Sequence, residues 1–263
     1  MIRTMPPAVV QAGSSEIRKV LSLRMNRVGA TVLVVAGALA FTVAAVTVTA
    51  VVGGQDDSEF VSAGGALAAA VLTLVVAIVA SGVFGAVGAG SEYRYRGIAV
   101  SALFTPDRNV LLGSKIAVTA AFSLLTVLGV ELLGLGAFLL FGRGRIEIQG
   151  SFYALLGGVL LAAVCWSIIG TALGFLLRAP AQAVAVLVGW SVLEPLVWVT
   201  ARAAGVAGIA AILPTSATIG TATVGSFADT DFVPPTPAAI VVLLLWTAGL
   251  VAAAWWYLRE RDL

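Results

Sequence analysis

Six apolar stretches, each long enough to cross a lipid bilayer, constrain this sequence more than any other feature. They run from about Val28 to Val52, Gly65 to Gly88, Leu111 to Phe141, Phe152 to Leu177, Ala181 to Ala201 and Ala238 to Leu258. A helix needs about 20 apolar residues to span the hydrocarbon core. The stretches therefore predict an all-α integral membrane protein with six transmembrane helices.

The composition supports a membrane location and narrows the chemistry. Only 11% of the 263 residues are charged, whereas soluble domains contain about 25%. The chain has no histidine, which removes Ser-His and Cys-His couples, histidine metal sites and histidine proton relays. The single cysteine, Cys165, allows no internal disulfide. We therefore expect no catalytic residue and no metal site, and we expect that the chain is not an enzyme by itself.

No nucleotide-binding motif is present in the sequence. The tripeptide "GSK" at Gly113 to Lys115 lacks the upstream glycine of a phosphate-binding loop. The basic residues stand at the ends of apolar stretches and do not form a clustered face, so nucleic-acid binding is not predicted either. We expect that this chain binds no cofactor of its own.

Lysine and arginine are distributed unevenly between the two ends of the stretches. Six spans place both termini on one side, and that side then holds twelve of the fifteen basic residues: Arg3, Arg18, Lys19, Arg24, Arg27, Arg94, Arg96, Arg108, Lys115, Arg178, Arg259 and Arg261. The other side holds Arg143, Arg145 and Arg202. Because basic residues accumulate in cytoplasmic loops, we expect both termini in the cytoplasm.

The segment before the first stretch predicts a helix lying on the membrane surface. In "SSEIRKVLSLRMNR", Ser14 or Ser15 is placed to cap a helix, with Glu16 in its first turn. One face at helical spacing is apolar, with Ile17, Val20, Leu21 and Met25. We therefore divide the chain into an interfacial amphipathic helix at residues 1–27 and a six-helix transmembrane domain at residues 28–263. A solvated stalk is the alternative for the first part.

Two further regions predict how the membrane domain is built. The connection from about Gly205 to Pro237 begins with the apolar run "GVAGIAAILPTSATIG". We expect it to dip back into the outer membrane face as broken helical pieces, which requires that protein buries its backbone. The third stretch is too long for a vertical span, so we expect tilt or a break near Gly134 and Gly136.

Small residues at spacing four mark helix-packing faces. Gly170 and Gly174 form a G-x-x-x-G pair, and Gly82, Ala86 and Gly90 repeat small residues every fourth position. Such faces let two helices approach closely. We expect packing inside one subunit, with a dimer face as the alternative.

Two acidic residues, Glu131 and Glu194, lie inside the apolar stretches, both in the predicted outer half. Charges at membrane depth are costly, so such residues face a cavity or a partner. One interpretation is a polar lining along a substrate path. The other is a pair of protonated or hydrogen-bonded glutamates that lock helices together.

The segment "EYRYRGIAVSALFTPDRNV", residues 92 to 110, contains most of the charge between two of the stretches. Glu92 and Arg96 have the spacing of a helical ion pair. Tyr95, Ile98, Ala99, Ala102 and Leu103 would share one apolar face, and Pro106 disfavours helix at the residue before it. The segment predicts a short amphipathic helix, either a docking element for a cytoplasmic partner or a surface helix that anchors the loop.

The same region resembles the permease subunits of ABC-2 type transporters. The family pattern has an E-[YF]-R start after the second span, an L-x-x-P-x-R turn and a basic entry to the third span. The matching residues are Glu92, Tyr93, Arg94, Leu103, Pro106, Arg108 and Lys115. The charged tail "YLRERDL", the six spans and the N-terminal helix extend the resemblance over nearly the whole chain. It departs from the commonest pattern at Gly97 to Ala99.

The resemblance implies a bacterial cytoplasmic-membrane permease subunit of an ABC exporter, without chemistry of its own. Separate ATPase subunits would bind ATP and Mg, and a second permease, identical or related, would complete the complex. The helix from Glu92 to Thr105 would be the coupling helix that contacts the ATPase, so Arg96 and Arg108 would belong to the coupling site. A lipid, glycolipid, peptide or hydrophobic drug would be the exported substrate.

A self-contained secondary carrier or channel is the main alternative. Carriers often contain internal repeats and ionisable residues near the membrane midplane. The sequence shows no convincing repeat, and it offers only Glu131 and Glu194 as such residues.

Overall fold

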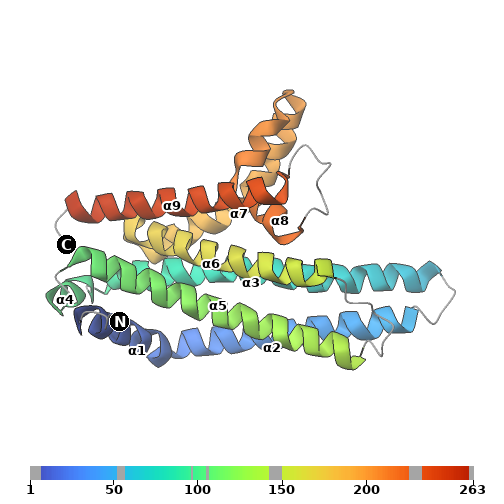
Figure 1. Ribbon diagram of the computed structural model, residues 1–263, viewed down its shortest axis with the longest axis horizontal. Helices are drawn as coiled ribbons and strands as arrows, with labels where there is room; N and C mark the ends of the chain where they lie inside the picture. The colour runs from blue at the N-terminus through green and yellow to red at the C-terminus, as the bar shows by residue number, and fades with distance from the viewer. Residues whose placement is uncertain are drawn as a thin grey trace, which may run out of the picture.

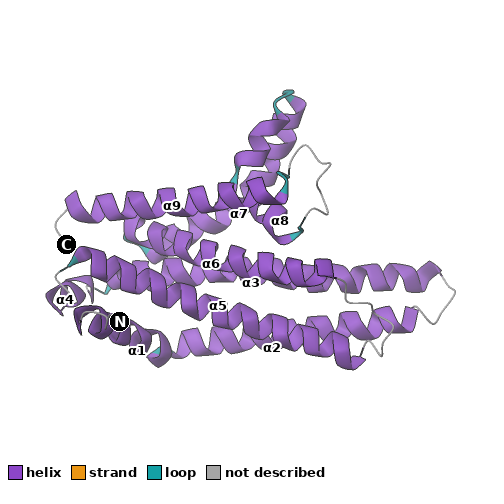
Figure 2. Cartoon of the chain, in the orientation of Figure 1, coloured by secondary structure: helices purple, strands orange, loops and turns teal. Residues whose placement is uncertain are grey.

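The described part of the chain is built from helices alone (Figure 2). The computed structural model describes residues 7–51, 57–95, 97–104, 107–141, 150–224 and 233–260, and within these ranges it contains no strand. The elements in chain order are α1 (Pro7–Ser22), α2 (Arg24–Val51), α3 (Asp57–Arg94), α4 (Gly97–Phe104), α5 (Arg108–Phe141), α6 (Gly150–Leu177), α7 (Pro180–Ala203), the 3-10 helix η1 (Ala207–Ile212), α8 (Pro214–Ala222) and α9 (Thr236–Glu260).

Six of these helices are long and apolar enough to cross a membrane, which confirms the predicted number. They are α2, α3, α5, α6, α7 and α9. The chain is a multi-pass membrane protein by this measure. The largest difference from the predicted boundaries is in the second span, which continues to Arg94.

The long helices run side by side, and the first and the last described residues lie at the same end of the bundle (Figure 1). This end, called the terminal end below, also contains α1 and α4. The opposite end is called the far end. The helix α7 leaves the bundle at an angle, and η1 and α8 then return to the side of the bundle (Figure 1).

Small residues join α3 to α6 at the centre of the bundle. Gly170 lies so close to Gly82 that an added Cβ would collide with the Gly82 carbonyl oxygen. An added Cβ at Gly174 would lie 2.8 Å from the carbonyl oxygen of Ala86. The two predicted small-residue faces therefore pack against each other within one chain, as expected.

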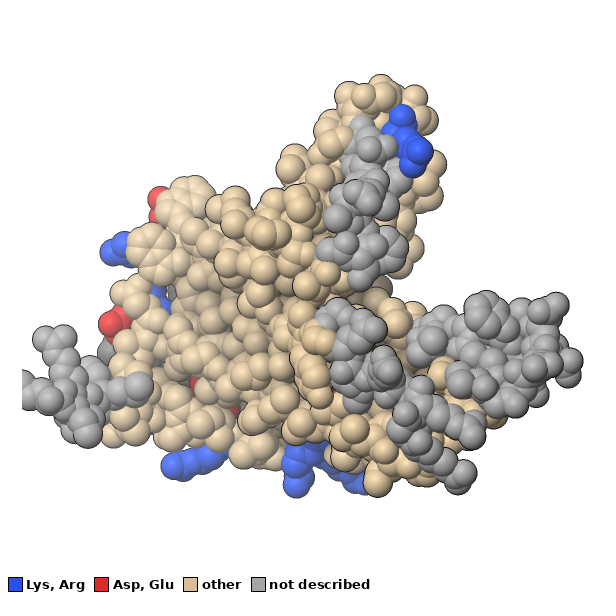
Figure 3. Space-filling view, turned by 45° about the vertical axis from the view of Figure 1, so that its right-hand side comes forward, with Lys and Arg blue, Asp and Glu red and all other residues tan. Residues whose placement is uncertain are grey.

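Large apolar side chains cover much of the outside of the bundle. Val32 and Leu39 on α2, and Val192 and Leu196 on α7, are all exposed. The face drawn in Figure 3 is mostly uncharged, with basic side chains at the left end, along the lower edge and on the upper projection. In water such an apolar surface would promote association, whereas in a bilayer it is the surface that meets lipid.

The helix α5 continues without a break through Gly134 and Gly136. Its 34 residues extend over about 50 Å, which exceeds the roughly 30 Å of hydrocarbon. Gly134 instead permits close packing, because a Cβ there would lie 2.8 Å from the Phe41 ring. The predicted break is therefore absent, and only tilt or extension beyond the bilayer remains.

The first helix differs from its prediction at its start. α1 begins at Pro7, so Ser14 and Ser15 lie within the helix and do not cap it. Their hydroxyls donate to the carbonyl oxygens of Gln11 and Ala12, each at 2.9 Å. Of the predicted apolar face, Ile17, Leu21 and Met25 are exposed, whereas Val20 is half-buried. That exposure suits a helix whose apolar side meets a membrane surface.

Short helical pieces follow α7, as the sequence predicted. η1 and α8 replace a free loop, and α8 packs against α6 and α9. Thr221 of α8 lies against Gly158 of α6, where an added Cβ would collide with the Thr221 carbonyl oxygen. Protein thus buries one side of α8.

Candidate functional site

The turn from α3 to α5 at the terminal end is the first part of the candidate site. The predicted single helix from Glu92 to Thr105 is wrong, because Glu92, Tyr93 and Arg94 form the last turn of α3. The N–H of Tyr95 donates to the Ser91 carbonyl oxygen at 3.0 Å and completes that turn. A separate helix, α4, then runs from Gly97 to Phe104. The predicted site residues Arg96 and Pro106 lie outside the described residues.

Four charged side chains meet behind this turn and are called the ionic cluster. Lys115 Nζ lies 3.0 Å from Glu16 Oε2 and 2.7 Å from Glu92 Oε1. Lys19 Nζ lies 2.6 Å from Glu16 Oε1 and 2.7 Å from Glu92 Oε1. The two lysines and two glutamates balance in charge, which buried ionic groups require.

Each ammonium group of the ionic cluster has three acceptors, which is all that a lysine can use. Lys19 also donates to Ser101 Oγ at 3.0 Å. Lys115 also donates to the Gly88 carbonyl oxygen at 3.5 Å. Because these groups lie on α1, α3, α4 and α5, the cluster joins the surface helix and the α3–α5 turn to two membrane spans.

Glu92 pairs with the two lysines, whereas its expected partner Arg96 lies outside the described residues. Sequence reasoning missed the ionic cluster because its members are distant in the chain, with Lys19 and Glu92 separated by 73 residues. One signal was present: Lys115 is a basic residue inside an apolar helix, and such a residue needs an acidic partner.

The ionic cluster also determines the ionisation of Lys19. Partial burial lowers its pKa, but hydrogen bonds to Glu16 and Glu92 and the charges of both carboxylates outweigh burial, so the pKa is raised above its usual 10.5. A raised folded-state pKa means that the stabilisation is fully present below the unfolded value. It is lost only as the pH rises through the higher folded-state value, well into the alkaline range.

A second set of contacts attaches the end of α9 to the start of α5. Arg108 donates to the carbonyl oxygen of Leu258, and also to that of Arg259 at 3.2 Å. Trp255 Nε1 donates to Asn109 Oδ1 at 2.6 Å. Arg108, predicted as a coupling residue, thus satisfies carbonyl groups in the last turn of α9, where a basic side chain is favoured.

Tyr93 attaches the end of α3 to the α6–α7 turn. Its ring meets Phe175 edge-on, with 6.1 Å between ring centroids. The Arg178 guanidinium lies 5.4 Å from the Tyr93 ring centroid and 4.9 Å from that of Tyr257. These cation–π contacts hold three helix ends together around Arg178.

The helix α4 is anchored on one side and open on the other. Ile98 is buried, whereas Leu103 is 81% exposed and Tyr95, just before α4, is 76% exposed. The residues of the predicted apolar face are therefore not all on one side: Ile98 faces the bundle, whereas Tyr95 and Leu103 are exposed. The side chains of Ala99 and Ala102 lie outside the described part. The outward residues leave an apolar surface at the end of the bundle, beside the exposed Arg94.

Glu194 lies fully buried in α7, beside Pro195, and accepts four hydrogen bonds. The backbone N–H groups of Thr215 and Ser216 donate to it at 3.0 and 2.9 Å. Trp190 and Trp198 donate at 2.8 and 3.3 Å. The carboxylate therefore caps the N-terminus of α8, where helix N–H groups lack partners. Of the two sequence interpretations, these contacts favour the locking role for Glu194.

Glu131 differs from Glu194 in its surroundings. It is buried in α5, and its Oε1 atom has no hydrogen-bond partner in the described structure. The two predicted path residues are thus not equivalent: one is part of a complete hydrogen-bond network, and the other is a buried acid without one.

We predict that Glu194→Gln lowers the free energy of unfolding by about 1–3 kcal/mol, because the amide leaves at least one buried N–H of α8 without an acceptor. Thermal unfolding of the purified protein in detergent measures this. Glu131→Gln is the matched control and should leave the melting temperature unchanged or raise it. Equal losses in the two variants would show that the α8 cap is not what Glu194 contributes.

Comparison with known proteins identifies no relative: no family model, no curated protein and no solved structure matches this chain.

Proposed function

We propose that this chain is the permease subunit of an ATP-driven exporter of the ABC-2 type, with its terminal end in the cytoplasm of a bacterium. The uneven distribution of lysine and arginine supports this orientation. The motif residues between α3 and α5 support the family. The chain would supply the membrane path, and separate ATPase subunits would bind ATP and Mg.

The observation on which the proposal rests is the α3–α4–α5 turn. It presents exposed apolar side chains, Tyr95 and Leu103, at the end of the bundle. Behind them the ionic cluster ties α4, through Ser101, to α1, α3 and α5. The ionic cluster connects this docking surface to several spans. A movement of the surface by a bound partner would therefore also move those spans.

This arrangement suggests how ATP hydrolysis would be coupled to transport. The ATPase would contact α4 and move it when ATP closes the ATPase dimer. Because Lys19 and Lys115 connect α4 and α3 to α1 and α5, the movement would reach the surface helix and the spans together. A second permease, identical or related, would form the other wall of a path for a hydrophobic or amphipathic substrate.

The direct test is purification of the tagged chain from its native membrane in mild detergent, with identification of what accompanies it by mass spectrometry. A stoichiometric protein that contains a G-x-x-x-x-G-K-[ST] loop would support the proposal. Recovery of the chain without any ATPase, under conditions that retain other membrane complexes, would contradict it.

We predict that the double variant Tyr95→Ala with Leu103→Ala reduces the ATPase recovered with the chain by about tenfold, since apolar anchors dominate interface energies. Leu140→Ala is the matched control, because Leu140 is 76% exposed on α5 but lies toward the far end. The control should retain the ATPase. Glu92 is a poor probe, because its removal would also disturb the two lysines of the ionic cluster.

A self-contained carrier is a second candidate, and one observation favours it. Glu131 is a buried acid without a hydrogen-bond partner in the described structure, as expected for a group that exchanges a proton or binds a cation during transport. Transport by the purified chain alone in vesicles, lost in Glu131→Gln, would support this candidate over the exporter.

A further inference from the structure

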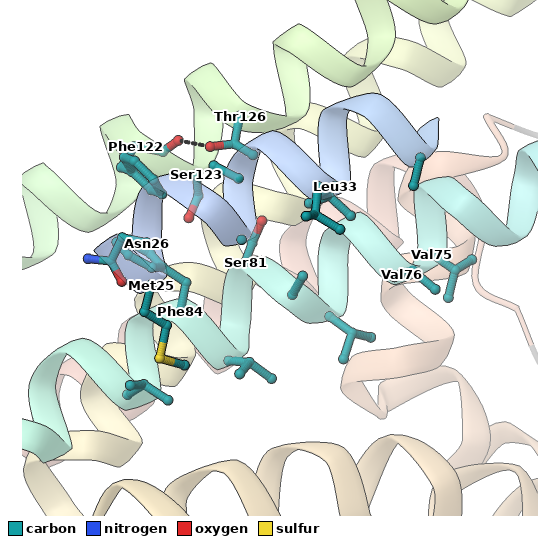
Figure 4. A pocket seen from close by; sticks show the side chains of 18 residues that line it. Met25, Asn26, Leu33, Val75, Val76, Ser81, Phe84, Phe122, Ser123 and Thr126 are labelled. Carbon is teal, nitrogen blue, oxygen red and sulfur yellow. Dashed lines mark hydrogen bonds between the residues drawn. The ribbon is translucent and has the colours of Figure 1, made fainter. Parts of the chain in front are cut away.

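An elongated apolar groove runs along α3 between α2 and α5 (Figure 4). Its volume is about 660 Å³, within the range of ligand-binding pockets. In Figure 4 it extends from Met25, Asn26 and Phe84 at one end to Val75 and Val76 at the other. The side chains around it are mostly those of valine, alanine, leucine and phenylalanine.

The length of the groove along the helix axis is close to the thickness of one leaflet of the hydrocarbon core. Its lining on α3 runs from Val75 to Val87, which corresponds to about 18 Å along the helix axis. Half of the hydrocarbon thickness is roughly 15 Å. A helix from a second copy would instead make contacts along the full depth of the span.

At the terminal end the groove adjoins a second cavity of about 1190 Å³, whose largely apolar lining includes five charged side chains. Met25, Asn26, Phe84 and Val87 line both spaces, so the two spaces are neighbours. The second cavity is bordered by α1, α2, α3, α4, α5 and α7. An apolar groove beside a cavity with charged side chains offers separate places for the apolar and the charged parts of an amphiphilic molecule.

The charges around the second cavity leave one cation available. Its charged lining residues are Glu16, Lys19, Glu92, Arg94 and Lys115. The ionic cluster uses four of them and is balanced in charge. Arg94 contacts the Tyr95 ring at 5.9 Å, and no acidic partner is found for it among the described residues. The cavity therefore has an excess positive charge, about 10 Å beyond the end of the groove at Val87.

We propose that the groove and the cavity together bind a membrane lipid with an anionic headgroup, taken from the leaflet at the terminal end. One acyl chain fills the α2–α3–α5 groove, and the headgroup phosphate binds near Arg94. A guanidinium is well suited to phosphate because it donates two parallel hydrogen bonds. The site does not depend on the ATPase, so it is tested on this chain alone.

The experiment uses the purified full chain in phosphatidylcholine vesicles with a minor fraction of photoreactive phosphatidic acid, whose diazirine lies in one acyl chain. Photoreactive phosphatidylcholine with the same chains is the headgroup control. Illumination and peptide mapping should place the label on α2, α3 and α5 beside the groove. Phosphatidic acid should label these peptides roughly two- to fivefold more than phosphatidylcholine, and Arg94→Gln should abolish the difference.

A second variant tests the groove itself. Gly29 lines the groove, and a Cβ added there meets no atom within 4 Å, so Gly29→Phe should fill the groove without disturbing the backbone. Gly157→Phe is the matched control, because Gly157 is also exposed with no atom within 4 Å of an added Cβ. Loss of groove labelling in Gly29→Phe alone supports the site.

Three results would overturn the proposal. The first is equal labelling by the two lipids, and the second is unchanged labelling of Gly29→Phe. The third is an absence of labelling together with a crosslinked dimer that Gly29→Phe abolishes, which would make the groove an interface between two copies of the chain. All three results are independent of whether an ATPase accompanies the protein.

Discussion

Lys115→Met is expected to lower the free energy of unfolding by about 3–5 kcal/mol, the cost of leaving a buried charge without its partner. Lys115 is only 5% exposed at its side chain and lies between Glu16 and Glu92. Without it, two largely buried carboxylates share one lysine. The melting temperature in detergent should fall by roughly 10 °C.

Two comparisons separate this effect from a general loss of charge. Lys19→Met should cost about 1 kcal/mol or less, because the Lys19 side chain is 41% exposed and exposed pairs contribute little. Adding Glu16→Gln to Lys115→Met should recover part of the loss, since one acid and one base then remain. If the double variant is the less stable one, charge balance is not what holds the ionic cluster together.

Gly170→Ala is expected to destabilise the bundle by about 1–3 kcal/mol or more, as overpacking of a close contact does. The added Cβ would collide with the Gly82 carbonyl oxygen and lie 3.1 Å from the Ala86 backbone nitrogen. Backbone atoms cannot move aside as a flexible side chain can. The α3–α6 contact would have to separate along its length, and the yield of folded protein should fall.

Gly157→Ala in the same helix is the matched control. Gly157 is exposed, and no atom lies within 4 Å of a Cβ added there. Alanine is the better helix former by about 1 kcal/mol, so this variant should be neutral or more stable. Similar thermal shifts in both variants would show that close packing at Gly170 contributes little.

Features that depend on local sequence were predictable. The six spans follow from runs of about 20 apolar residues, which any such helix needs regardless of its neighbours. For the α3–α6 contact, the sequence predicted the packing face on each helix but not that the two faces pack against each other. Small residues at spacing four indicate a packing face, whereas they do not indicate which helix packs there. The broken helical pieces after α7 followed from an apolar run interrupted by Pro214.

The features that sequence reasoning missed or placed wrongly depend on contacts between helices that are distant in the chain. Nothing near Glu92 in the sequence indicates that Lys19 and Lys115 are its partners. Likewise, the donors around Glu194 include backbone N–H groups of α8, whose position follows from tertiary packing. The end of α3 was misplaced because its last turn is polar and resembles the start of a new helix.

The bonds between Glu194 and α8 have a consequence for how the far end can vary. Ser216 follows Glu194 by 22 residues, so a single carboxylate pins both ends of the intervening segment. The entropy of closing such a loop grows slowly with its length. Insertions or deletions between the end of α7 and Pro214 should therefore be tolerated while the spans keep their places. The surface that this segment forms at the far end can therefore change in length and sequence while the packing of the membrane spans stays the same.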